Sequence, residues 1–482
     1  MDEKNQKRTA VSSSTVPREN KMGVMPINKL LITMSLPMII SMLVQALYNI
    51  VDSIFVAQLD ANGATNALDA VTLAFPMQML MIAVASGLGV GINSTLSKSL
   101  GQKDHAKANK LAVNGLLLIL CGYLLFLFIG LFISRLFISS QTADAKTIEY
   151  GVSYTTIVCT MSFGLFGQIA FERLLQSTGK TIFSMIMQLT GAVINLVLDP
   201  ILIFGLGGFP ALGVAGAAVA TVAGQIVAFI LGIIFNTCFN KEIHLSFRKF
   251  KPNGSLIKEI LSTGIPSIIM QAIGSVMTYC MNCILGAFAY GVTVFGIYFK
   301  LQSFIFMPIF GFNNGMVPII AYNYGAEKKE RLMKTIKLSI IYAVSMMLIG
   351  LVVIQIIPEQ LLSMFNSDSN MLAVGVPALR TISLSFTFAG FCIILLSVFQ
   401  AVGKALYSMV VSICRQIVIL VPAAFLLSLS GNVQFVWWAF PIAEVVSLTL
   451  SIIFLFIVKK HTIDLLPDVP PVIEDKPDLS EI

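Results

Sequence analysis

The stretch Gln176-Ser177-Thr178-Gly179-Lys180 recurs 224 residues later (403 − 179) as Gln400-Ala401-Val402-Gly403-Lys404, with the Gln, Gly and Lys unchanged. The same offset relates further glycines on both sides of this stretch. These pairs are Gly87 and Gly311, Gly91 and Gly315, Gly101 and Gly325, Gly151 and Gly375, and Gly207 and Gly431. One constant offset over so much of the chain indicates an internal duplication.

The composition places both halves of the duplication in a membrane. Of the 482 residues, 56% are hydrophobic and 11% are charged, whereas soluble domains carry about 25% charged residues. Apolar runs long enough to cross a bilayer as helices lie near residues 30–56, 70–97, 111–133, 149–171, 181–204, 211–236, 261–288, 292–321, 336–357, 372–397, 407–429 and 434–458. The sequence therefore predicts an all-α membrane protein with twelve transmembrane helices in two pseudo-symmetric six-helix lobes. Two lobes that rock against each other are the usual plan of a secondary transporter.

The positive charges predict the orientation. We expect an amino-terminal tail, a first lobe, a connector, a second lobe and a carboxyl-terminal tail at residues 1–29, 30–236, 237–260, 261–458 and 459–482. With the amino terminus inside, 25 of the 31 Lys and Arg residues fall in the tails and loops of one side, as is typical of cytoplasmic loops. We therefore expect a multi-pass protein of the plasma membrane with both termini cytoplasmic. This retention of charge accounts for the net charge of +7, so no nucleic acid partner is expected.

Three patterns that suggest enzyme chemistry have simpler interpretations. Gly179-Lys180-Thr181 ends like a phosphate-binding loop, but the Gly required five residues before Gly179 is Leu174. The Cys280 and Cys283 pair lies in an apolar span with no second pair of metal ligands. No Asp-rich metal motif and no aligned nucleophile and base are found, so we expect neither an enzyme nor a cofactor other than a coupling ion.

Polar side chains within the apolar spans are the candidates for function, because an Asp at the bilayer centre costs about 2.5 to 3.5 kcal/mol on insertion scales. In the first half these are Asp52, Asn195 and Asp199, with Glu172 at the inner end of its span. Asn195 and Asp199 are four residues apart, which places them on one helical face. Two converging oxygen-bearing side chains suit a sodium ion or a shared proton. The structural alternative is a buried hydrogen bond to a neighbouring helix.

The duplication provides an internal control for these residues. At the offset of 224, Asn195 corresponds to Ile419 and Asp199 to Ala423, and aligning Pro37 with Pro266 places Asp52 opposite Met281. The second half therefore folds without these polar groups, which favours a functional role in the first half.

The second half carries a different set of charges within its spans, namely Lys300, Arg380, Arg415 and Glu444. A structural interpretation pairs Glu444 with Arg415 or Arg380 as a buried ion pair. Alternatively, the basic residues hold the pyrophosphate of a lipid-linked glycan.

Pro37 interrupts the hydrogen bonding of the first span and predicts a kink there. A kink that responds to distant protonation would act as a gate. A static bend is the structural alternative.

Several motifs together resemble the multidrug and toxic compound extrusion family, over about residues 29–458. They are Leu36-Pro37-Met38-Ile39, Tyr48-Asn49-Ile50-Val51-Asp52, Leu175-Gln176-Ser177-Thr178-Gly179-Lys180, Asn195-x-x-Leu198-Asp199-Pro200, Gly213-x-x-Gly216-Ala217-Ala218-x-Ala220-Thr221 and Pro441-Ile442-Ala443-Glu444. The resemblance implies twelve helices in two lobes and the export of bulky cationic or amphipathic compounds, driven by inward movement of Na⁺ or H⁺.

The resemblance also implies a coupling site in the first lobe. The family's Asp on helix 1, Asn and Asp on helix 5 and Thr on helix 6 look like Asp52, Asn195, Asp199 and Thr221 here, and Glu172 falls where some relatives have another polar ligand. A sodium ion would then be held by Asp52, Asn195 and Asp199. The acid that other branches carry on helix 7 has no counterpart, since residues 261–288 contain no acid.

The leading hypothesis is an ion-coupled antiporter that works as a monomer in the lipid bilayer and exports small organic cations or amphipathic drugs. The alternative is a flippase for a lipid-linked glycan or another amphiphile, because related two-lobed folds move such lipids.

Overall fold

The structure is a computed structural model that describes residues 19–61, 67–246, 251–365 and 368–467. The side chains at 49, 50, 52–54, 56–61 and 68 lie outside that description. The helices of the first half are α1 (Lys21–Val24), α2 (Ile27–Ala61), α3 (Ala67–Gly101), α4 (His105–Phe128), η1 (Ile129–Ile133), α5 (Ser134–Ser139), α6 (Ala145–Thr160), α7 (Phe163–Ser177), α8 (Thr181–Phe204), η2 (Leu206–Gly208) and α9 (Val214–Phe239).

The second half repeats this plan. Its helices are α10 (Gly254–Leu285), α11 (Gly291–Gly325), α12 (Lys329–Ile356), α13 (Pro358–Ser363), α14 (Ser369–Ser383), α15 (Phe386–Ala401), α16 (Ala405–Ile413), η3 (Cys414–Leu420), α17 (Val421–Ser428), α18 (Val433–Val436), α19 (Ala439–Val458) and η4 (Lys459–Ile463).

The described residues form helices and no strands, so the prediction of an all-α fold is confirmed. Ten helical segments are long and apolar enough to cross a membrane, and two bent helix pairs bring the number to twelve. The bent pairs are α6 with α7, at 41°, and α14 with α15, at 47°. They begin and end 224 residues apart, and Asp144 and Asp368 cap their first helices by accepting from the backbone N–H groups of Thr147 and Asn370.

The repeated Gln-x-x-Gly-Lys stretch ends the second helix of each bent pair. Gly179 and Gly403 have φ of 81° and 78°, a left-handed conformation that glycine adopts without steric cost. The following Lys180 and Lys404 donate their backbone N–H groups to Leu175 and Phe399 at 2.8 and 2.7 Å, which satisfies carbonyls at the helix end. The motif that reveals the duplication is thus a pair of helix-ending turns.

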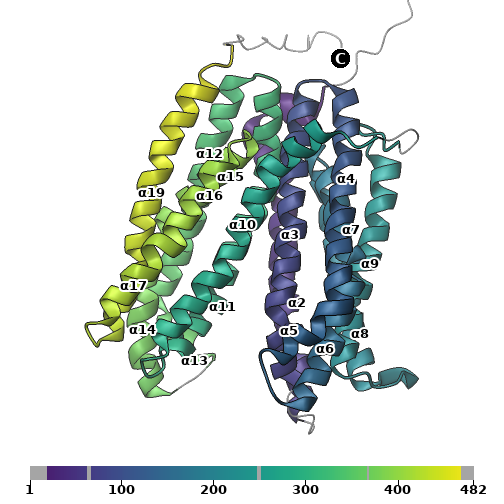
Figure 1. Ribbon diagram of the computed structural model, residues 1–482. Coiled ribbons are helices and arrows are strands. Elements are labelled where there is room, and N and C mark those ends of the chain that lie inside the picture. The colour runs from purple at the N-terminus through teal and green to yellow at the C-terminus, as the bar shows by residue number, and fades with distance from the viewer. Residues whose placement is uncertain (1–18, 62–66, 247–250, 366–367, 468–482) are drawn as a thin grey trace, which may run out of the picture.

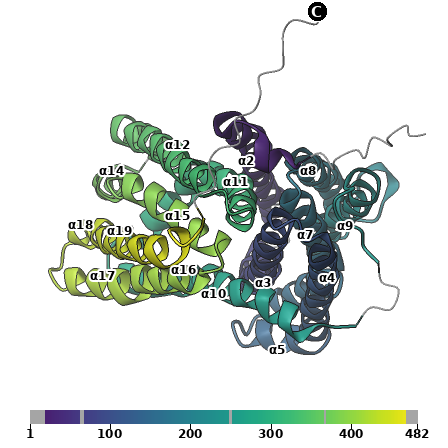
Figure 2. The same cartoon turned by 90° about the horizontal axis from the view of Figure 1, so that it is seen from above.

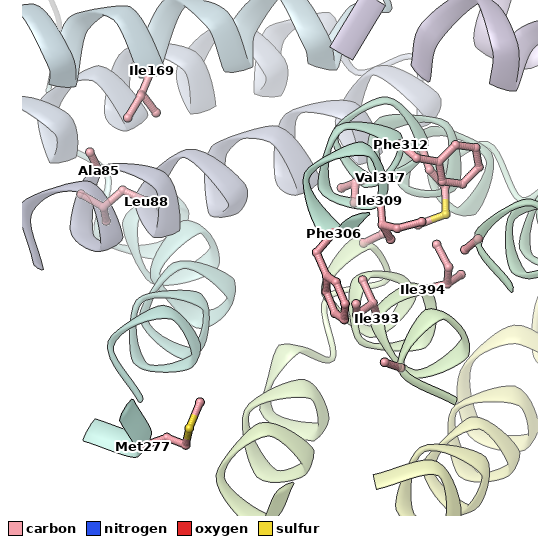
Figure 3. Packing of buried hydrophobic residues seen from close by; sticks show 14 of the residues in the cluster. Ala85, Leu88, Ile169, Met277, Phe306, Ile309, Phe312, Val317, Ile393 and Ile394 are labelled. Carbon is pink, nitrogen blue, oxygen red and sulfur yellow. The ribbon is translucent and has the colours of Figure 1, made fainter. Parts of the chain in front are cut away.

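The lobe interiors repeat the same packing. In the first lobe Leu88 lies on α3 and Ile169 on α7, two helices that pack together. In the second lobe Phe312 and Ile393 occupy the positions 224 residues later on α11 and α15 (Figure 3). All four side chains are buried. The two cores therefore use corresponding helices and corresponding positions.

The two lobes lie side by side, with α2 to α9 in one and α10 to α19 in the other (Figures 1 and 2). Helices α2 and α10 lie at the boundary between the lobes, where α10 packs along α3 and α2 packs along α11. The lobes approach each other at the end that carries residues 237–246, residues 251–254 and α1, which we call the connector end. Their ribbons diverge toward the opposite end (Figure 1).

Glycines make this approach possible, and the contacts are reciprocal. A Cβ built at Gly101 of α3 would lie 2.1 Å from the carbonyl oxygen of Tyr322 on α11, and one at Gly325 of α11 would lie 2.0 Å from that of Lys98 on α3. Gly101 and Gly325 are repeat partners, and so are Lys98 and Tyr322. Backbones therefore touch at this level, where no side chain fits.

Further glycines extend the pattern away from the connector end. A Cβ at Gly91 would meet the Ile260 carbonyl oxygen of α10 at 2.4 Å, and one at its partner Gly315 would meet the Ser35 backbone nitrogen of α2 at 2.7 Å. The close packing of the two halves is therefore built twice, once by each copy of the duplication.

We expect Gly325→Ala to lower the free energy of unfolding by about 1 to 3 kcal/mol, the usual cost of overpacking, because its new methyl group would meet the Lys98 backbone. The thermal unfolding midpoint of the purified protein in detergent measures this effect. Gly296→Ala is the matched control on the same helix, since a Cβ there has no neighbour within 4 Å. Equal midpoints for the two variants would contradict the role of glycine in this contact.

Candidate functional site

Asn195 and Asp199 lie on one buried face of α8, as their spacing predicts. They are 4% and 0% exposed. The Asn195 amide nitrogen lies 3.4 Å from Asp199 Oδ1 and 3.2 Å from Thr221 Oγ1 of α9. Turning this amide over lets it donate to Asp199 Oδ2 at 3.3 Å and accept from the Thr221 hydroxyl at 3.2 Å. The structure therefore brings three of the predicted coupling residues together.

The side chain of Asp52 lies outside the described residues, although its position on α2 is described. The neighbouring contact is informative, because Phe55 of α2 packs edge-on against Phe204 of α8 with 6.5 Å between ring centroids. Phe55 follows position 52 by three residues, and Phe204 follows Asp199 by five. The turn of α2 that carries Asp52 therefore lies close to the level of Asp199.

Glu172 lies in a separate buried cluster. It is 3% exposed on α7, and its carboxylate accepts a hydrogen bond from Gln176 at 2.7 Å. The Arg173 guanidinium donates to Gln176 at 2.8 Å and to Asn314 of α11 at 2.9 Å. The chain of hydrogen bonds runs from a buried carboxylate in one lobe to an amide in the other.

Arg173 and Asn314 were not singled out from the sequence, and Gln176 was noted as part of the repeated motif and not as a site residue. Arg173 was counted with the cytoplasmic loop charges, because hydropathy ends its span near residue 171. In the structure α7 continues to Ser177 and Arg173 is 8% exposed. The duplication held a usable signal, since the partners of Glu172 and Arg173 are Leu396 and Ser397, so this charged pair belongs to the first half alone.

The charges of the second lobe do not gather at one place. Glu444 is 6% exposed on α19 and forms an ion pair with Arg415 at 3.3 Å, so of the two predicted partners Arg415 is the one found. Arg415 lies in η3, a π-helical segment between α16 and α17. Arg380 is exposed, and so is Lys300, whose ammonium lies 5.7 Å from the Phe365 ring centroid.

Pro37 lies within the unbroken helix α2 and is half-buried. Its neighbour Met38 is fully buried. A Cβ built at Gly311 of α11 would lie 2.6 Å from the Met38 carbonyl oxygen. Pro37 therefore lies in the turn of α2 that packs against α11.

We expect Arg415→Leu to destabilise the protein by about 3 to 5 kcal/mol, because it leaves the Glu444 carboxylate buried without its charge partner. The double variant Arg415→Leu with Glu444→Leu should recover most of this loss, because both charges are then removed. Thermal unfolding midpoints of the single and double variants measure the difference. A single variant as stable as the parent would show that the ion pair has no structural role.

The chemistry of the α8 and α9 cluster suits a small hard cation or a proton. Asp199 supplies a carboxylate, Asn195 an amide oxygen and Thr221 a hydroxyl, and oxygen atoms are the ligands that hard cations prefer. Among the described residues, no group of three or more His, Cys, Asp or Glu could hold a metal ion. The cluster therefore differs in its donors from a transition-metal site.

Comparison with known proteins assigns the family. The sequence profile of the MatE family matches residues 37–201 and 266–426, more than half of the chain. The chain belongs to the MatE family. The two matched segments fall on the two halves of the duplication.

Curated relatives and solved structures agree with this membership. The chain is 28% identical over 438 residues to the multidrug export protein MepA of Staphylococcus haemolyticus (strain JCSC1435), covering 90% of this chain and 95% of that protein. It is 24% identical to MepA of Staphylococcus aureus (strain MRSA252), covering 91% and 96%.

Among solved structures, one described as a MATE protein in complex with MaL6 has a TM-score of 0.85 and 25% identity, covering 92% of this chain and 99% of the other. Another is described as the outward-facing conformation of a multidrug resistance MATE family transporter of the MOP superfamily, with a TM-score of 0.85, 26% identity and the same coverage. A third, from Pyrococcus furiosus Vc1 (DSM3638), is described as a MOP superfamily transporter whose binding pocket of reverse polarity suggests a different function, at 26% identity. The MatE membership rests on the two matched segments, and the similarity to these structures extends over about nine tenths of the chain, so the two-lobe fold is confirmed.

Proposed function

We propose that this protein is a secondary active antiporter that exports bulky cationic or amphipathic compounds in exchange for H⁺ or Na⁺. The observation that carries the proposal is the buried contact of Asn195 with Asp199 and Thr221 in one lobe only. Relatives named as multidrug export proteins support the class of cargo. The protein is a multi-pass protein of the plasma membrane, and we place both termini in the cytoplasm and propose that it works as a monomer.

The arrangement of the lobes supports the proposal of alternating access. If the connector end is cytoplasmic, as the Lys and Arg distribution indicates, the lobes diverge toward the outside (Figure 1). The similarity to an outward-facing MATE structure supports this assignment. Binding of an ion by Asp52 and Asp199, with Asn195 and Thr221 as neutral ligands, would bias the lobes toward one of the two states.

The energetics of one coupling ion are sufficient. A monovalent ion that crosses a membrane potential of about 150 mV releases about 3.5 kcal/mol, at roughly 2.3 kcal/mol per 100 mV. This free energy supports a gradient of several hundredfold for a neutral compound. A single site in one lobe is therefore enough to drive export of a neutral compound.

We expect Asp199→Asn to reduce energy-dependent efflux of a cationic dye at least about tenfold, because the substituted amide neither binds nor releases a proton and holds Na⁺ poorly. Dye accumulation in cells that express the variant measures the loss. Asp69→Asn is the matched control, since Asp69 is an exposed carboxylate in the first turn of α3. Unchanged efflux with unchanged ion dependence in Asp199→Asn would refute its assigned role.

We expect dye uptake into proteoliposomes to be driven by an imposed pH gradient or by an imposed Na⁺ gradient, when the two are applied separately. The variant Thr221→Val should distinguish coupling to H⁺ from coupling to Na⁺. A sodium ion would lose a ligand in Thr221→Val, so Na⁺-driven transport should fall several-fold, whereas H⁺-driven transport should be nearly unchanged. If neither gradient drives transport, antiport is excluded.

The flippase alternative has less support. It needs basic groups that can bind a diphosphate, but Arg415 is paired with Glu444, and Lys300 and Arg380 lie on other helices at exposed positions. The buried carboxylates of the first lobe, Asp199 and Glu172, favour cationic cargo instead.

A further inference from the structure

Residues 19–26, directly before α2, lie across the connector end and contact both lobes. Within this segment α1 is a single turn capped by Asn20, whose side-chain oxygen accepts from the Met22 backbone N–H at 2.9 Å. The Met22 side chain is fully buried. A segment that orders its backbone and buries a large apolar side chain is a packed part of the structure and not a free tail.

The contacts with the first lobe and the connector come from Asn20. Its amide nitrogen donates to the Thr178 carbonyl at 3.1 Å, where α7 ends. The same group lies 2.8 and 2.7 Å from the two carboxylate oxygens of Glu242, in the connector. Burial raises the pKa of Glu242, and the Asn20 hydrogen bond opposes that shift by favouring the charged form. Asn20 is therefore an important donor to a half-buried carboxylate.

The contacts with the second lobe come from α11, α12 and the turn between them. Asn323 donates to the Met22 carbonyl at 3.1 Å, and Arg331 donates to the carbonyls of Met22 and Met25 at 3.2 and 2.8 Å. Lys328 donates to the Gly23 carbonyl at 2.9 Å and pairs with Glu19 at 2.6 Å. Two cations, Lys328 and Arg331, and the Asn323 amide thus hold the carbonyls of residues 22, 23 and 25 from the second lobe.

We propose that residues 19–26 form a strap that fastens the two lobes together at the connector end and stabilises the conformation in which this end is closed. Opening this end separates Thr178 and Glu242 from Asn323 and Arg331, so the strap must lose its contacts with one side. The strap rests on the proposed alternating access and specifies what holds one of its two states.

The test measures the distance between the lobes directly. Spin labels at Lys110→Cys on α4 and Lys334→Cys on α12, which are exposed repeat partners, report the separation of the lobes at the connector end. They are placed in a background without the seven native cysteines and measured by pulsed electron paramagnetic resonance in lipid nanodiscs. No substrate or ion gradient is needed, so a failed transport assay and a failed strap give different results.

Asn20→Asp keeps a good helix cap but turns the donor into an acceptor that faces Glu242. We expect it to raise the ratio of the long-distance to the short-distance population roughly tenfold, as expected when hydrogen bonds to a charged group are lost. In the double variant Asn20→Asp with Glu242→Gln the amide and the carboxylate have exchanged places, so the hydrogen bond can form again. The ratio should then return toward that of the parent.

Met22→Ser should raise the same ratio, because it empties a buried apolar site. Val24→Ser is its control on the same turn, since Val24 is 42% exposed, and should leave the distances unchanged. Parent-like distances in both Asn20→Asp and Met22→Ser would overturn the proposal. Failure of Glu242→Gln to reverse the effect of Asn20→Asp would overturn the assigned contact.

Discussion

Close contact of Gly101 and Gly325 with the backbone of the opposite lobe, at the connector end, is the constraint on which the rest of the structure depends. Where a Cβ would lie 2.0 to 2.1 Å from a carbonyl oxygen of the opposite lobe, two helices approach as closely as their main chains allow. Small residues have this role wherever helices associate in a bilayer, because lipid gives no hydrophobic force to bring them together. Because the lobes are held together at this end, they diverge toward the opposite end. The buried polar groups of the first lobe lie between these two ends.

The packing contacts between the lobes are duplicated, whereas the buried carboxylates are not. The contacts that hold the lobes together occur twice and in equivalent places, as at Gly101 and Gly325. The carboxylates of the two buried polar contacts occur once: Asp199 in the first lobe and Glu444 in the second lie at positions where the other half has alanine. The ion pair of Glu444 with Arg415 neutralises the second lobe locally. The first lobe retains the Asp199 carboxylate in contact with the Asn195 amide, which in turn contacts the Thr221 hydroxyl. This is the asymmetry that the proposed coupling needs.

Most of the fold could be predicted from the sequence, because spans of apolar residues and a fixed repeat offset are properties of the chain itself. The bends between α6 and α7 and between α14 and α15 could not, since each break falls inside a continuous apolar run. The i, i+4 contact of Asn195 with Asp199 followed from helical spacing. Contacts between distant helices did not follow from any local rule, so the choice of Arg415 over Arg380 as partner of Glu444 was left open. Arg173 was missed because hydropathy ends a span where the charge begins, whereas the helix continues.

The reciprocal glycine contacts have one more consequence. Each half presents the same patch and receives the same patch from its counterpart, which is the form of an isologous contact between identical subunits. If the first half were expressed alone, the main chain of α2 and α3 that now packs against the second half would be exposed to lipid. The best available cover would be another copy of the first half, in the place that the second half now fills.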